Sequence, residues 1–114
     1  MNPPHGHADG SQPLRVLHYA DLETVYDDSE HVGRLTECIN ELRDENTMVV
    51  GAGDNTALGS LALVTDKGRA QARPFFDAVR PDAETFGNHD FDHGTDSALE
   101  LADRTPQQWL CANV

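Results

Sequence analysis

Short apolar runs alternate with helix-like patterns along most of the chain. The apolar runs are short and bounded by polar or turn-forming residues, as is typical of buried strands. They predict strands at residues 14–20, 47–52, 83–86 and 108–114. The last of these, which includes Trp109, is expected to be a core strand.

The segments between the runs favour helices. Apolar residues recur at helical spacing over 29–46, with Ser29 as the expected N-cap. A second helix is expected over 74–79, with Pro74 in its first turn. A third is expected to begin near Asp96, with Ser97 and Glu100 at capping-box spacing, and to end before Pro106. Residues 55–67 fit either a short helix or a buried loop.

This alternation of strands and helices predicts an α/β fold with a mostly parallel sheet flanked by helices. Ligands bind at the carboxyl ends of the strands in such sheets. A polar cluster comes directly after each of the first three predicted strands. The clusters are Asp21 and Glu23, then Asp54, then the loop from Asn88 to Asp92. We therefore expect the three clusters to form one shared site.

The side chains of these clusters suit metal chemistry. Asp21, Glu23, Asp54 and Asn88 offer oxygen ligands, which favour manganese, magnesium, calcium or iron, with zinc a candidate if histidines join. A carboxylate such as Asp54 can bridge two ions, as in two-metal phosphoester hydrolysis.

An imidazole and a carboxylate complete the expected chemistry. His89 suits a general acid, because its pKa lies near working pH, and Asp92 could orient its ring. Each group also has a structural interpretation. Asp21 and Asp54 could cap helices, Asn88 and Asp90 could form turns, and His89 could be a partly buried structural residue.

The charge narrows the possible functions. The chain has 20 acidic and 8 basic residues and a formal net charge of −12, and Lys67 is its single lysine. Such a surface indicates a protein adapted to concentrated salt, where the screening length falls to about 3 Å at 1 M. The alternative is an acidic mesophilic protein or a fragment of skewed composition. No basic stripe is present for nucleic acid, and no apolar run approaches the length of a membrane helix. No nucleic-acid or membrane partner is therefore expected.

The remaining features concern the ends and the cysteines. Residues 1–13 have the composition of a disordered tail and lack the apolar segment of a secretory signal, so a cytoplasmic location is expected. Cys38 and Cys111 are too few and too far apart for a disulfide framework, and we expect both to be buried, inert thiols.

Four segments together resemble the calcineurin-like metallophosphoesterases, and most closely the 5′-nucleotidase/2′,3′-cyclic phosphodiesterase family. They are residues 16–21 (VLHYAD), 51–55 (GAGDN), 87–94 (GNHDFDHG) and 110–114 (LCANV). The resemblance covers residues 14–114 and implies a dinuclear metal centre that hydrolyses phosphate esters of nucleotides. By this resemblance Asp21, Asp54 and Asn88 would bind metal, with Asp54 bridging, and His89 paired with Asp92 would be catalytic.

The chain departs from the family pattern in two ways. The family's first motif is Asp-x-His, and Glu23 stands at the histidine position, where it can still ligate. The family's later metal-binding histidines and its nucleotide-recognising domain would lie beyond residue 114. We therefore expect 14–114 to be the N-terminal half of a metallophosphoesterase domain, inactive without its missing C-terminal portion. The alternative is a non-enzymatic remnant or a small metal-binding or partner-binding module.

Overall fold

The structure, a computed structural model, describes residues 12–56, 60, 64 and 72–112. Its elements are β1 (Arg15–Tyr19), the 3-10 helix η1 (Glu23–Asp27), α1 (Ser29–Leu42), β2 (Thr47–Gly51), α3 (Ala72–Val79), β3 (Ala83–Glu84), the 3-10 helix η2 (His89–Phe91), α4 (Thr95–Asp103) and β4 (Gln108–Trp109). The expected tail lies outside the described residues except for 12 and 13. Of the ambiguous segment 55–67, only 55, 56, 60 and 64 are described.

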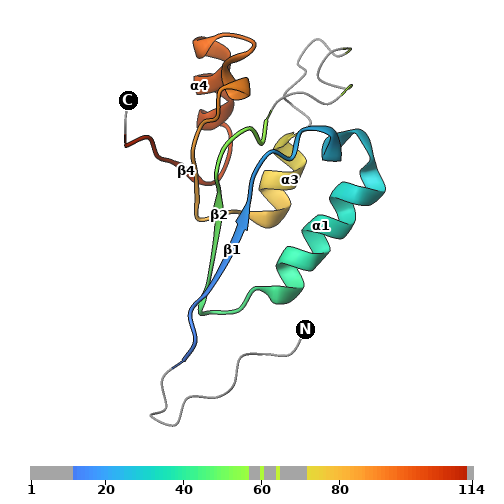
Figure 1. Cartoon of the computed structure of the whole chain (residues 1–114), viewed down its shortest axis with the longest axis vertical. Coiled ribbons are helices and arrows are strands. Elements are labelled where there is room, and N and C mark those ends of the chain that lie inside the picture. Colours follow the sequence, from blue (N-terminus) through green and yellow to red (C-terminus); the bar gives the residue numbers. More distant parts are fainter. Residues whose placement is uncertain (1–11, 57–59, 61–63, 65–71, 113–114) are drawn as a thin grey trace.

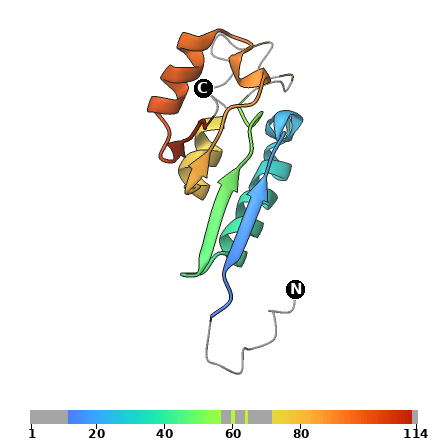
Figure 2. The same cartoon turned by 60° about the vertical axis from the view of Figure 1, so that its left-hand side comes forward.

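The four strands form one parallel sheet in the order β1-β2-β3-β4 (Figures 1 and 2). β1 and β2 pair along their whole length, from Arg15 opposite Thr47 to Tyr19 opposite Gly51. β3 pairs with both β2 and β4 over a shorter length. The predicted α/β fold with a mostly parallel sheet is confirmed. Every strand therefore ends at the same edge of the sheet.

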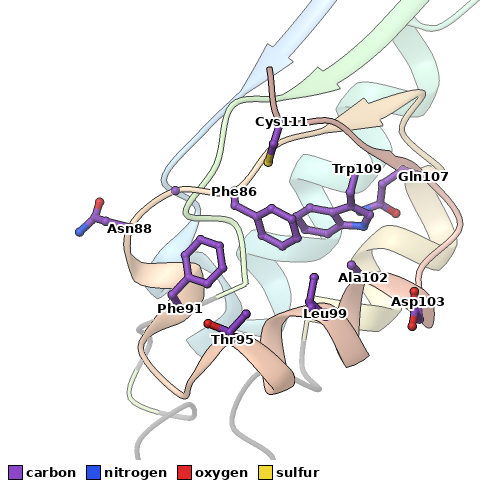
Figure 3. A pocket seen from close by; sticks show the side chains of 11 residues that line it. Phe86, Asn88, Phe91, Thr95, Leu99, Ala102, Asp103, Gln107, Trp109 and Cys111 are labelled. Carbon is purple, nitrogen blue, oxygen red and sulfur yellow. The ribbon is translucent and has the colours of Figure 1, made fainter. Parts of the chain in front are cut away.

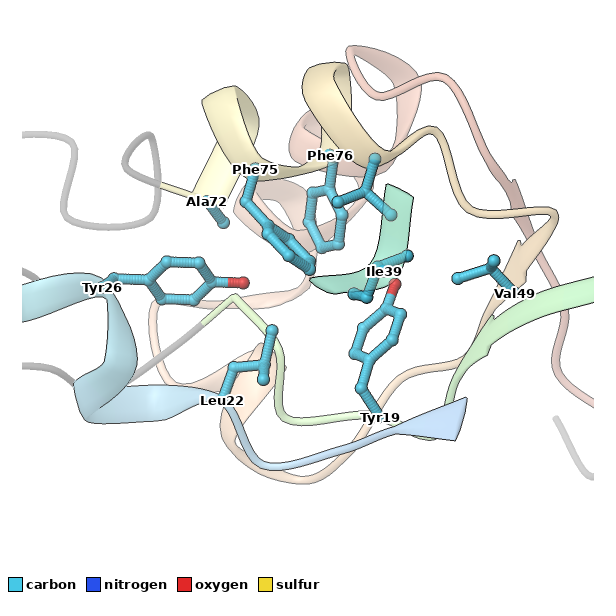
Figure 4. Close-up of a cluster of buried hydrophobic side chains, with 9 residues drawn as sticks. Tyr19, Leu22, Tyr26, Ile39, Val49, Ala72, Phe75 and Phe76 are labelled. Carbon is cyan, nitrogen blue, oxygen red and sulfur yellow. The ribbon is translucent and has the colours of Figure 1, made fainter. Parts of the chain in front are cut away.

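The hydrophobic core lies between one face of the sheet and the helices α1 and α3 (Figure 4). Tyr19 from β1 meets Phe75 from α3 edge to face, with ring centroids 5.6 Å apart. Ile39 is the buried residue of α1, as the helical spacing predicts. On the other face of the sheet Val16 and Met48 are 53% and 45% exposed. Helices thus cover one face of this pair of strands, and α4 lies toward the carboxyl ends of the strands (Figures 1 and 2).

Three features of the helix ends differ from the prediction. Asp28, not Ser29, caps α1, since its side chain accepts hydrogen bonds from the amides of Glu30 and His31. The helix ends at Leu42 rather than 46, because the next residue is extended and the Asp44 carboxylate binds the Asn46 amide in a turn. α4 begins at Thr95 after Gly94, and no side chain caps it. Its proposed capping box is therefore wrong.

The two cysteines and the last strand also differ from expectation. Both cysteines are free and exposed. Cys38 is displaced by about 100° of helical rotation from Ile39, which points into the core. β4 pairs over Gln108 and Trp109 alone, so Leu110 is 56% exposed and Cys111 is exposed beyond it. The prediction of buried thiols and of a core strand continuing through these residues is wrong.

No helix in the described part of the chain is both long and apolar enough to cross a bilayer.

Candidate functional site

Three loops meet where β1, β2 and β3 end. The Asp21 amide donates a hydrogen bond to the Gly53 carbonyl at 3.1 Å, which joins the first loop to the second. The His89 amide donates to Asp54 Oδ1 at 2.8 Å, which joins the third loop to the second. The convergence expected from the parallel strand order is present, and backbone amides of the first and third loops donate hydrogen bonds to the second loop.

Glu23, Asp54 and His89 form a compact group at this meeting point. Each offers one ligand atom, and these atoms all lie within 4.8 Å of one another. One residue comes from each loop. Two carboxylates and an imidazole at this separation can hold a divalent cation, and the donor set fits manganese, iron or zinc better than a thiolate-preferring ion.

Asp54 is the most constrained of the three. It is 9% exposed, and its φ of +57° places a non-glycine residue in the left-handed region. The His89 amide binds Oδ1, which leaves Oδ2 for a cation. Gly53 has a φ of +99°, and a β-carbon there would lie 2.7 Å from the Gly87 amide nitrogen. The second and third loops therefore approach more closely than side chains at these glycines would allow.

The two acidic residues of the first loop have strained backbone conformations. Asp21 and Glu23 have φ values of +54° and +33°. Strain of this kind, at a cost of about 1–3 kcal/mol per residue, is concentrated at functional sites. Glu23 is half-buried and belongs to the group, whereas Asp21 is exposed and is not one of its three residues. Asn88 is exposed on the third loop and turns away from the neighbouring aromatic side chains (Figure 3).

His89 and Asp92 form the contact that their spacing predicts. His89 Nδ1 lies 2.9 Å from Asp92 Oδ2 across one turn of η2. The hydrogen bond with Asp92 raises the pKa of the His89 imidazole, and the charges of Asp92, Asp54 and Glu23 act in the same direction. Since Nδ1 is engaged by Asp92, Nε2 is the nitrogen left for a cation or a substrate.

The buried side chain of Asp90 joins the second and third loops. The sequence offers a turn as its structural interpretation, and in the fold Asp90 is only 1% exposed. Oδ2 accepts hydrogen bonds from the amides of Asp54 and Gly87 at 3.0 and 2.8 Å, and Oδ1 accepts from the amide and hydroxyl of Thr56. Asp90 thus fixes the backbone of the second loop at Asp54 and Thr56 and that of the third loop at Gly87.

Glu84 is a second buried carboxylate, under the first and second loops. It accepts hydrogen bonds from the Gly53 amide at 3.1 Å, from the Tyr19 hydroxyl at 2.9 Å and from the Asn55 carboxamide. Asn55 Oδ1 in turn accepts from the Leu22 amide at 3.2 Å. The sequence analysis missed Glu84, although an acidic residue inside a short buried strand is a signal that could have found it, since buried charges require partners.

Glu84 makes the stability of the protein depend on pH. Burial raises the pKa of Glu84 from 4.5 to about 7, against the opposing effect of its hydrogen bonds. Between these values the folded state binds the proton and the unfolded state does not, so stability falls as pH rises from about 4.5 to 7. The contribution is about 3 kcal/mol, present at low pH and lost above 7.

Urea denaturation of the wild type and of Glu84→Gln across this pH range measures the effect. The difference between the two proteins isolates Glu84 from the other carboxylates. This difference in the free energy of unfolding should change by about 3 kcal/mol between pH 4.5 and 7, with the wild type relatively more stable at pH 4.5. A difference that is constant with pH, or that shifts the other way, would show that folding does not raise the pKa of Glu84.

Comparison with known proteins relates the chain to a curated protein. No protein-family model matches the chain. The chain is 31% identical to human 5′-nucleotidase over an alignment of 109 residues, which covers 82% of this chain and 19% of that protein. The chain thus spans about a fifth of the length of this relative. The similarity supports a distant relation between the chain and the 5′-nucleotidase family.

Proposed function

We propose that the three loops form part of the metal centre of a divalent-metal-dependent phosphoester hydrolase that acts on a small phosphate ester such as a nucleotide. The observation that carries the proposal is the meeting of Glu23, Asp54 and His89 at the carboxyl edge of the sheet. The similarity to 5′-nucleotidase supports a phosphate ester as the substrate.

The donor set fits a divalent cation. Asp54 and Glu23 bring two negative charges to one point, and no lysine or arginine is hydrogen-bonded to either among the described residues. A bound cation would act as a Lewis acid that polarises a phosphoryl oxygen. Glu23 and Asp54 are the proposed ligands of one ion, and the His89 ring nitrogen within 4.8 Å of their oxygens is reserved for the phosphate ester. For a two-metal centre, Asp21 and Asn88 are the proposed further ligands, because both are exposed on the same loops.

His89 is the proposed proton donor or hydrogen-bond donor to the phosphate ester. Its Nδ1 is held by Asp92, which fixes the ring and favours the charged form. A protonated imidazole can donate from Nε2 to an oxygen of the ester or of its leaving group. Asp92 acts through His89 and needs no contact with substrate.

Metal binding to the chain tests the site. Asp54→Asn keeps an oxygen that can accept from the His89 amide but removes the charge. We expect this change to lower the affinity for Mn²⁺, measured by calorimetry, at least about tenfold. Glu23→Gln should weaken binding in the same direction. Asp96→Asn, at an exposed position in the first turn of α4, is the matched control and should bind as the wild type does.

Selective binding of a phosphate ester tests the function. With Mn²⁺ and in molar salt, which screens the net charge of −12, we expect AMP to bind and adenosine not to bind. Chelation of the metal or Asp54→Asn should remove the difference. Release of phosphate from bound AMP would show hydrolysis directly. Equal binding of AMP and adenosine, or binding of AMP that does not need the metal, would contradict the proposal and leave a metal-binding module as the better account.

A further inference from the structure

The buried residue Asn55 joins the second loop of the candidate site to the first. It follows Asp54 in the sequence, and none of its surface is exposed. Its side-chain Oδ1 accepts a hydrogen bond from the Leu22 amide at 3.2 Å, and its backbone carbonyl accepts one from the Tyr26 hydroxyl. Leu22 stands directly before Glu23, and Tyr26 stands three residues after it. Asn55 therefore binds the first loop on both sides of Glu23.

Glu84 fixes the direction of the Asn55 carboxamide. Nδ2 of Asn55 lies 3.1 and 3.2 Å from the two oxygens of the Glu84 carboxylate and donates to them. Because an amide nitrogen can only donate, this contact turns Oδ1 toward the Leu22 amide. The same carboxylate accepts from the Gly53 amide, on the other side of Asp54. A chain of hydrogen bonds thus runs from the second loop through Glu84 and Asn55 to the first loop.

Glu23 has a backbone conformation that its neighbours must hold in place. Its φ of +33° is unfavourable for a residue with a side chain. Such a conformation persists only where surrounding contacts fix it. Leu22 and Tyr26 supply these contacts through Asn55, and both turn their side chains into the buried cluster (Figure 4). The Glu23 carboxylate is thereby kept within 4.8 Å of the Asp54 carboxylate.

We propose that Asn55 is a positioning residue of the metal centre, which holds Glu23 in this conformation so that its carboxylate reaches the same cation as Asp54. Glu84 supports this role by orienting the carboxamide. The inference rests on the proposed metal centre, and it assigns Asn55 no contact with the cation or with the phosphate ester. Without Asn55, the backbone of Glu23 is free to relax to a negative φ, and its carboxylate then moves away from Asp54.

A double-mutant cycle on Mn²⁺ affinity tests the proposal. Asn55→Leu has a side chain of similar size and removes the acceptor of the Leu22 amide. We expect it to lower the affinity for Mn²⁺, measured by calorimetry, about tenfold. In a Glu23→Gln background the same change should lower the affinity less than about twofold, because the carboxylate that Asn55 positions is already absent. A purely structural role would give the same loss in both backgrounds.

Two milder variants separate positioning from a loss of stability. Tyr26→Phe removes the other contact with Asn55 but keeps the ring that packs against Phe75, and it should lower the Mn²⁺ affinity about threefold. It also carries the test if Asn55→Leu does not fold. Thr47→Val is the control, since it removes two hydrogen bonds with Asp44 at the opposite end of β2. It should lower stability and bind Mn²⁺ as the wild type does.

NMR chemical shifts of the Glu23 backbone, measured without metal, keep this test apart from that of the metal centre. In Asn55→Leu and Tyr26→Phe these shifts should move toward the values of a residue with negative φ. Unchanged shifts in both variants would overturn the proposal, and so would wild-type Mn²⁺ affinity in both or an equal loss in the Glu23→Gln background. If the wild type bound no Mn²⁺, the metal centre would be contradicted, and the shifts would still decide whether Asn55 holds Glu23.

Discussion

Replacing Asp90 with alanine is expected to destabilise the protein by about 4 kcal/mol or more and to weaken metal binding. The Asp90 carboxylate accepts from the amides of Asp54, Gly87 and Thr56 and from the Thr56 hydroxyl. Its removal leaves four buried donors without that acceptor. Each buried donor left unpaired costs about 1–3 kcal/mol, and relaxation of the loops recovers part of the sum.

Urea denaturation of Asp90→Ala and Asp92→Ala, two residues apart in one loop, gives the comparison. Asp92 is exposed and binds His89 alone, so its replacement should change the free energy of unfolding by less than about 1 kcal/mol. Similar losses for the two variants would mean that Asp90 does not hold the loops. Mn²⁺ affinity should also fall for Asp90→Ala, because the Asp54 backbone is no longer fixed.

Adding one methyl group at Gly87 is expected to disrupt the metal site and to cost about 3 kcal/mol. A β-carbon at this position would lie 2.2 Å from Asp54 Oδ1 and 2.7 Å from the Asp54 amide nitrogen. Overpacking of this kind typically costs 1–3 kcal/mol, or about the upper value where backbone must move. Asp54 must shift to make room, so Mn²⁺ affinity should fall at least about tenfold.

Gly33→Ala is the control for this variant. Gly33 lies within α1, and a β-carbon there meets no atom within 4 Å. Alanine should therefore stabilise the protein by about 0.5–1 kcal/mol, through its higher helix propensity. If Gly87→Ala kept wild-type stability and Mn²⁺ affinity, the close approach of the second and third loops would not matter for the site.

The position of the candidate site could be predicted because it follows from strand direction alone. Glu23, Asp54 and His89 lie far apart in the sequence, but each follows a strand that the apolar runs predict. Parallel strands deliver their following loops to one edge of the sheet. The His89–Asp92 contact was also predictable, since three residues span one turn.

The supporting residues could not be predicted by the same means. Asp90 has the local features of a turn former, and its burial depends on donors from the β2 loop more than thirty residues away. Glu84 owes its role to Tyr19, Gly53 and Asn55, all distant in sequence. Local patterns carry no information about such partners. The α1 cap shows the same limit at short range: Asp28 and Ser29 are both good caps, and the loop geometry selects Asp28.

The close contact between Gly51 and Glu84 is expected to make these two positions covary among related chains. A β-carbon on Gly51 would lie 2.0 Å from Glu84 Oε2, so β2 and β3 share one small space and Glu84 fills it. A change at either position alone should be tolerated poorly: a side chain at 51 collides with the acid, and a short residue at 84 leaves the space empty. Homologues are therefore expected to vary the two positions together, with glycine at 51 beside a long residue at 84, and a larger residue at 51 beside a short one at 84.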